Sequence, residues 1–120
     1  MSTAAIHANA FYGQVAKEGS LFSFSDEDSM LVFLIRDCEV TPFWSSRSRI
    51  ERVRDEHPKY AALVIDQVPL EKFMLKTLPH LEAEGIHIGV NWSGARLTGY
   101  DVSAPDLRRN IGYWLSKQAG

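Results

Sequence analysis

The stretch IHIGVNWSGARLTGYDV, residues 86–102, constrains the fold more than any other part of the chain. Apolar and polar residues alternate along it at period two, which is typical of a half-buried β-strand. The alternation is interrupted at Ser93-Gly94, two residues that favour a turn. We therefore predict two strands, over residues 86–92 and 97–102, joined as a β-hairpin.

Trp92 stands where the first of these strands meets the turn. In an uninterrupted strand it shares a face with Ile88 and Val90, so we predict that it packs at the edge of the core and that its indole N–H finds a partner. The alternative is that Asn91, Trp92 and Ser93 line a surface used by a binding partner, because tryptophan is enriched at interface hot spots.

The remaining periodicities predict helices alternating with strands. In chain order we expect a helix over 8–19, strands over 21–24, 30–35 and 38–43, a helix from Ser45 or Ser46 to His57, a strand over 61–65, a helix over 69–85 broken near Leu78 by Pro79, and a final helix after Ser103. The first three strands are expected to form a meander, with a tight turn at Arg36-Asp37 and with the run MLVFLI (30–35) buried.

These elements predict an α+β fold. We expect a single domain over residues 1–120, with a mainly antiparallel sheet of five or six strands and with helices packed largely on one face. The length of 120 residues is enough for one hydrophobic core.

Composition excludes several classes of partner. The chain has 13 basic and 15 acidic side chains, so it lacks the basic surface that nucleic-acid binding requires, and we expect no nucleic-acid partner. It contains neither a signal-peptide pattern nor an apolar run of roughly 18–20 residues, so we expect no membrane contact. The single cysteine, Cys38, agrees with a reducing compartment. We therefore expect a cytoplasmic protein.

Residues that commonly carry chemistry are scattered along the sequence. The chain has no phosphate-binding loop, dinucleotide-binding turn or nucleophile elbow. The histidines show no zinc-binding spacing, so we expect no metal and no cofactor. Cys38 is expected to be a small buried hydrophobe rather than a reactive thiol. An enzyme would require two or more of Cys38, His57, His80, His87 and nearby carboxylates to converge in one pocket.

The segment PFWSSRSR, residues 42–49, is the most suggestive local feature. Trp44, Ser45, Ser46 and Arg47 meet at a predicted helix start, where free N–H groups and the helix dipole attract anions. The segment is equally consistent with a simple helix cap that binds nothing, because serine is a favoured N-cap residue.

The blocks PFWSSRSR, PLEKFMLKTLPHLEAEGIHIGVNWSG and TGYDV resemble an uncharacterised bacterial family, catalogued as domain of unknown function 2750. The resemblance covers roughly residues 10–105. The chain departs from the family pattern at Pro69, where a serine-type helix start is more usual, and in its apolar run MLVFLI. The family has no established activity, so the resemblance implies no catalytic residues.

Together these observations predict a non-catalytic protein-binding module of the immunity or accessory type, an expectation by analogy with other small bacterial domains. One alternative is a small-ligand or anion-binding sensor that uses the helix start at residues 44–47. The other is an enzyme of unknown type.

Overall fold

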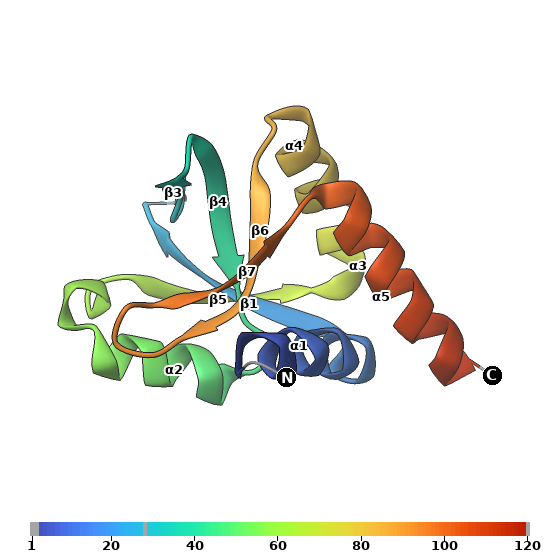
Figure 1. Cartoon of the computed structure of the whole chain (residues 1–120), viewed down its shortest axis with the longest axis horizontal. Helices are drawn as coiled ribbons and strands as arrows, with labels where there is room; N and C mark the ends of the chain where they lie inside the picture. The colour runs from blue at the N-terminus through green and yellow to red at the C-terminus, as the bar shows by residue number, and fades with distance from the viewer. Residues whose placement is uncertain (1–2, 28, 120) are drawn as a thin grey trace.

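The computed structural model describes residues 3–27 and 29–119. Helices separate groups of strands along the chain (Figure 1). The elements are α1 (Thr3–Glu18), β1 (Ser20–Asp26), β2 (Ser29–Met30), β3 (Phe33–Ile35), β4 (Cys38–Phe43), α2 (Arg47–Glu56), the 3₁₀ turn η1 (Pro58–Tyr60), β5 (Val64–Pro69), α3 (Leu70–Lys72), the π-helical turn η2 (Phe73–Thr77), α4 (Leu78–Ala83), β6 (His87–Ser93), β7 (Thr98–Val102) and α5 (Ala104–Ala119).

The α+β class is confirmed, but the described strands form two sheets instead of one. One sheet has the order β2-β1-β5 and the other the order β3-β4-β6-β7. Strands β4 and β6 are parallel, and the other strand pairs described are antiparallel. The predicted meander is wrong because β1 and β3 lie in different sheets. A single bridge between Phe22 and Trp44 connects β1 to the end of β4.

The run MLVFLI is not the buried strand that we predicted. It is divided between β2 in one sheet and β3 in the other. Val32 is 41% exposed, Leu34 72% and Ile35 37%. The tight turn that follows is confirmed, since Arg36 and Asp37 both have positive φ angles, as a two-residue type I′ hairpin turn requires.

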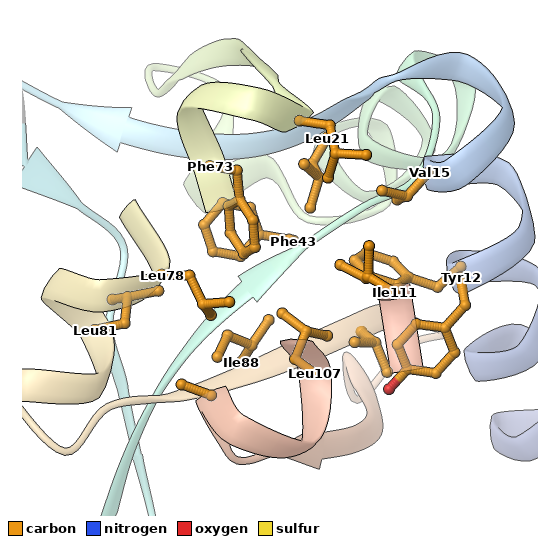
Figure 2. Close-up of a cluster of buried hydrophobic side chains, with 14 of the residues drawn as sticks. Tyr12, Val15, Leu21, Phe43, Phe73, Leu78, Leu81, Ile88, Leu107 and Ile111 are labelled. Atoms are coloured by element: carbon orange, nitrogen blue, oxygen red, sulfur yellow. The ribbon is translucent and has the colours of Figure 1, made fainter. Parts of the chain in front are cut away.

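The large core lies between the sheets and helices α1, α3, α4 and α5 (Figure 2). Helix α1 packs on α5 and on strands β6 and β7, so the first and last helices cover the same core, as predicted. Burial of these apolar stripes is the main stabilising contribution, at about 25 cal/mol per Å². The fully buried side chains of this core include Phe11, Val15, Leu21, Phe43, Phe73, Leu78, Leu81, Ile88, Leu107 and Ile111.

A small core lies on the opposite face, where helix α2 covers strands β1 and β4. It is rich in aromatic rings, and the rings of Phe24 and Trp44 meet edge to face with centroids 5.3 Å apart. Its buried residues are Phe22, Phe24, Val40, Trp44, Ile50, Val53, Tyr60 and Trp92.

The predicted break near Leu78 takes the form of the π-helical turn η2. Pro79 has no N–H to donate to residue 75, and its ring crowds the carbonyl of that residue. The helical turn before the proline contains one extra residue. The Leu78 N–H therefore donates to the carbonyl of Phe73, five residues earlier. Among the described residues, no helix combines the length and apolarity needed to cross a membrane.

Candidate functional sites

The two segments predicted to carry a site, residues 44–47 and 91–93, lie side by side. Parallel pairing places Phe43 of β4 opposite Val90 of β6, so the residues that follow each of these positions meet. The indole Nε1–H of Trp44 donates to the carbonyl oxygen of Trp92 at 2.8 Å. Trp44 is 0% exposed and Trp92 3%, so both side chains belong to the interior.

Asn91 is the centre of a buried polar network. Its φ angle is 50°, in the left-handed region that asparagine tolerates better than most residues. Its Oδ1 accepts the backbone N–H of Ser45 at 2.9 Å, and its Nδ2 donates to the Ser45 hydroxyl and to the carbonyl of His7. The Ser45 hydroxyl also binds Oε1 of Gln14, and the Ser93 hydroxyl lies 3.1 Å from Nδ1 of His7. The network therefore fastens α1 to the ends of β4 and β6.

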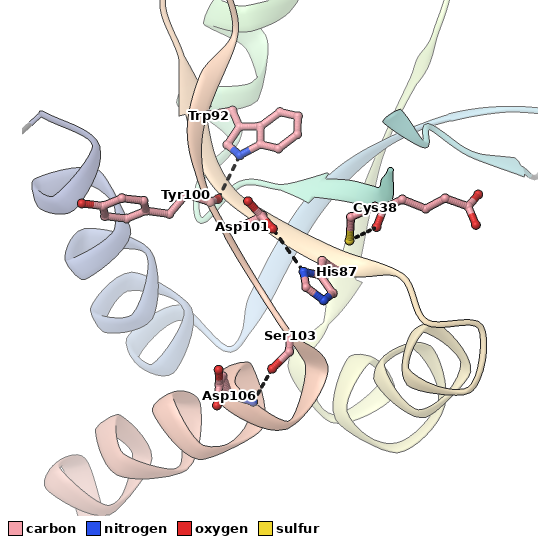
Figure 3. Close-up of polar contacts among 8 residues, drawn as sticks. Cys38, His87, Trp92, Tyr100, Asp101, Ser103 and Asp106 are labelled. Atoms are coloured by element: carbon pink, nitrogen blue, oxygen red, sulfur yellow. Dashed lines mark hydrogen bonds and ion pairs between the residues drawn. The ribbon is translucent and has the colours of Figure 1, made fainter. Parts of the chain in front are cut away.

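The left-handed turn at Asn91 changes the face on which Trp92 lies. The pairing of β6 with β7 shifts register between Val90 and Ser93, as in a β-bulge. Ile88 and Val90 therefore face the large core, whereas Trp92 faces the small core, and the predicted shared face is wrong. The expected partner of the indole N–H exists, since Nε1 donates to the carbonyl of Tyr100 at 2.9 Å (Figure 3).

Ser46 and Arg47, at the start of α2, reach the surface. Ser46 is the N-cap, and its hydroxyl accepts the Arg49 N–H at 3.3 Å. The Arg47 guanidinium lies 5.3 Å from the centre of the Phe22 ring, beside a cavity of about 280 Å³. Glu18 lines the same cavity and opposes the binding of an anion there.

A second arginine contacts Gln14, one of the residues that line this cavity. Arg49 donates from Nε to Oε1 of Gln14 at 3.3 Å. Burial lowers the pKa of Arg49, and the positive charge of Arg52 lowers it further. An arginine nevertheless keeps its proton at neutral pH. The helix start thus combines cationic groups with the carboxylate of Glu18.

An apolar surface that sequence reasoning missed runs along β3. We call Val32 and Leu34 the strand-edge patch, since they lie on one face of the strand while Phe33 and Ile35 lie on the other. In the described part of the four-stranded sheet, β3 pairs with β4 alone, so its other edge is open. Beside Val32 lies a hollow of about 410 Å³, whose lining includes Asp26 and Glu27.

A cavity of about 600 Å³ lies on the face of the four-stranded sheet beyond Trp92. Cys38, His87 and Asp101 all line it. His87 Nδ1 lies 3.1 Å from Asp101 Oδ2, with 38% and 40% of the two side chains exposed. Sequence reasoning did not bring these residues together because it did not predict the parallel pairing of β4 and β6. Of the residues that the structure describes, no group of three or more His, Cys, Asp or Glu is placed to hold a metal ion.

Comparison with known proteins finds a match to the model of one protein family. No curated protein is significantly similar to the chain. The family model described as protein of unknown function (DUF2750) matches residues 8–111, which include Asn91, the start of α2 and the large cavity. The chain therefore belongs to the DUF2750 family.

Proposed function

We propose that this chain is a cytoplasmic bacterial protein-binding module, of the immunity or accessory type, and that its partner binds along the open edge of β3. The observation that carries the proposal is the exposure of the strand-edge patch. Leu34 is 72% exposed although it lies in the most apolar run of the chain. Contiguous exposed apolar side chains commonly mark interaction sites.

The backbone of β3 favours a partner in extended conformation. Hydrogen-bonded and non-hydrogen-bonded pairs alternate along antiparallel strands. At least one of the three residues of β3 therefore directs its N–H and C=O away from β4, toward the open edge. An added strand would bind these groups, with affinity from the backbone and specificity from alternate side chains.

The charges around the patch favour a basic partner. Asp26 and Glu27 line the hollow beside Val32, and Glu39 pairs across from Leu34. Two copies of this acidic edge would repel each other, because like charges placed opposite one another destabilise a strand pair. The expected occupant is therefore an extended segment of another protein that alternates apolar and basic residues.

Synthetic peptides test this proposal. A peptide alternating valine and lysine should bind, as measured by fluorescence anisotropy, and a matched peptide alternating valine and glutamate should not. Leu34→Lys should weaken binding at least about tenfold, because it removes an apolar contact and adds repulsion. Leu75→Lys is the matched control, since Leu75 is 68% exposed on η2, outside the patch.

Three outcomes would contradict the strand-edge proposal. Equal binding of the two peptides would show that charge does not select the partner. Equal loss of binding in Leu34→Lys and Leu75→Lys would show that the edge is not the site. A concentration-dependent dimer in sedimentation, abolished by Leu34→Lys, would assign the edge to a second copy of this chain.

A sensor at the start of α2 is supported less well. Trp44 and Ser45 are buried and hydrogen-bonded within the protein, so Ser46 and Arg47 alone of the predicted residues are left to contact a ligand there. Titration with inorganic phosphate, followed by tryptophan fluorescence, distinguishes the two proposals. A saturable change that Arg47→Ala abolishes would favour the sensor.

A further inference from the structure

The cavity beyond Trp92 is lined by a thiol, an imidazole and a carboxylate from three neighbouring strands. Cys38 lies on β4, His87 on β6 and Asp101 on β7. His87 pairs across from Val40, and Asp101 across from Gly89, so both lie on the face of the sheet that carries the small core. Cys38, two residues before Val40, lies on this face too. Figure 3 shows the three side chains on the same side of the sheet.

Asp101 orients the imidazole of His87. Its Oδ2 lies 3.1 Å from Nδ1 of His87, where a carboxylate accepts an N–H. A proton held on Nδ1 leaves Nε2 as the basic nitrogen. The arrangement therefore places an oriented imidazole in the same cavity as the thiol, and an adjacent base of this kind activates cysteine nucleophiles when the two groups come within hydrogen-bond reach.

The thiol itself contacts the backbone and not the imidazole in this structure. Cys38 Sγ donates to the carbonyl of its neighbour Glu39 at 3.6 Å, a weak contact. Rotation about the Cα–Cβ bond of Cys38 releases this contact at small cost, since staggered side-chain rotamers are close in energy. Catalytic hydrogen bonds commonly tighten only when substrate is bound.

The cavity walls indicate the class of substrate. Ile35, Leu97 and the indole of Trp92 supply an apolar side, and Arg36 supplies a cation. An apolar wall suits the hydrocarbon part of an acyl group, and a cation suits a carbonyl oxygen that gains negative charge. A volume of about 600 Å³ accommodates a small acyl donor.

We propose that Cys38 accepts an acyl group from a thioester in this cavity. His87 Nε2 removes the proton from Cys38 Sγ, and the thiolate electron pair forms a bond to the acyl carbon. The bond between that carbon and the donor sulfur breaks, and the leaving thiolate takes the proton from His87. The products are S-acyl Cys38 and a free thiol, so no oxidant or cofactor is required.

The test uses a butyryl thioester of a small thiol and the full chain, with the butyryl adduct followed by intact mass spectrometry. Wild type should form the adduct about a hundredfold faster than the free thiol N-acetylcysteine at neutral pH, the scale of general-base catalysis. His87→Gln should lose this advantage, whereas His80→Gln, at an exposed histidine on α4, should keep it. Cys38→Ser removes the only cysteine and should form no adduct.

Asp101→Asn tests the positioning role. This change keeps the shape of the side chain but removes its charge, so it should both slow adduct formation and change its pH profile. A rate for wild type equal to that of N-acetylcysteine, an unchanged rate in His87→Gln, or an adduct in Cys38→Ser would overturn the proposal. None of these outcomes bears on the strand-edge patch, because the side chain of Leu34 lies on the opposite face of β3 from Ile35, which lines the cavity.

Discussion

The backbone N–H of Ser45 donates a hydrogen bond of 2.9 Å to Oδ1 of Asn91, 46 residues later in the chain. Ser45 and Asn91 are each 1% exposed. A buried N–H that loses its acceptor costs about 1–3 kcal/mol. This bond therefore makes the side chain of residue 91 a structural requirement of the segment that precedes α2.

Replacing Asn91 should destabilise the protein strongly. We expect Asn91→Ala to reduce the free energy of unfolding by about 2–4 kcal/mol, because it removes the side-chain hydrogen bonds to Ser45 and His7 and leaves a less tolerant residue at a φ of 50°. Urea unfolding followed by tryptophan fluorescence measures the change. Asn91→Gly removes the same bonds but fits the backbone, so its loss should be smaller. Equal losses in the two variants would exclude a contribution from the backbone.

The packing of Trp92 on Gly89 should be intolerant of a single methyl group. A Cβ at position 89 would lie 2.5 Å from the indole ring of Trp92, which is buried and also hydrogen-bonded to Tyr100. We expect Gly89→Ala to destabilise the protein by about 1–3 kcal/mol, the usual cost of overpacking. Thermal unfolding followed by circular dichroism measures it.

Gly112→Ala is the matched control for this experiment. Nothing lies within 4 Å of a Cβ at position 112, in the middle of α5. Alanine there should stabilise the protein by about 0.5–1 kcal/mol, since glycine is unfavourable inside a helix. Destabilisation at position 112, or tolerance at position 89, would contradict the packing described here.

Stability should decrease at alkaline pH because of Tyr12. Burial raises the pKa of Tyr12 above 10.0, the Asn110 hydrogen bond lowers it, and the charge of Asp106 raises it. The folded state therefore holds this proton more tightly than the unfolded state. The resulting stabilisation is fully present below pH 10 and is lost as pH rises through the pKa of the folded state.

Urea unfolding between about pH 8 and pH 12 tests this expectation. In Tyr12→Phe the decrease of stability above pH 10 should be shallower than in wild type. Tyr113→Phe, which removes a phenol from a side chain that is 57% exposed, is the control and should leave the decrease in place. Identical alkaline behaviour of wild type and Tyr12→Phe would show that burial of this phenol does not govern the decrease.

Local signals predicted local structure well. Ser46 is the N-cap of α2, the Ser103 hydroxyl accepts the Asp106 N–H at 3.3 Å, and Gly19 has a φ of 74° just after α1. Pro79 interrupts its helix because a missing N–H has the same consequence in any context. Each of these features depends on residues within one helical turn of each other.

Features that depend on contacts between distant residues could not be predicted from the sequence. Period-two alternation assigns faces only while a strand is regular, and the left-handed Asn91 reverses the face for Trp92. An apolar run does not reveal whether it is covered, and so Leu34 was expected in the core. The meeting of Cys38 with His87 depends on the parallel pairing of β4 with β6, for which neither strand carries a local signal.

That parallel pair also has a consequence for synthesis of the chain on the ribosome. Phe43 of β4 pairs with Val90 of β6, so β4 cannot complete its pairing until β6 has been synthesised. At roughly 5–20 residues per second this delay is about 2–10 s. During this interval one edge of β4 is unpaired while the apolar β3 hairpin beside it is already complete. The nascent chain is therefore most exposed to aggregation between the emergence of α2 and that of β6, and a chaperone that binds apolar extended segments would act in this interval.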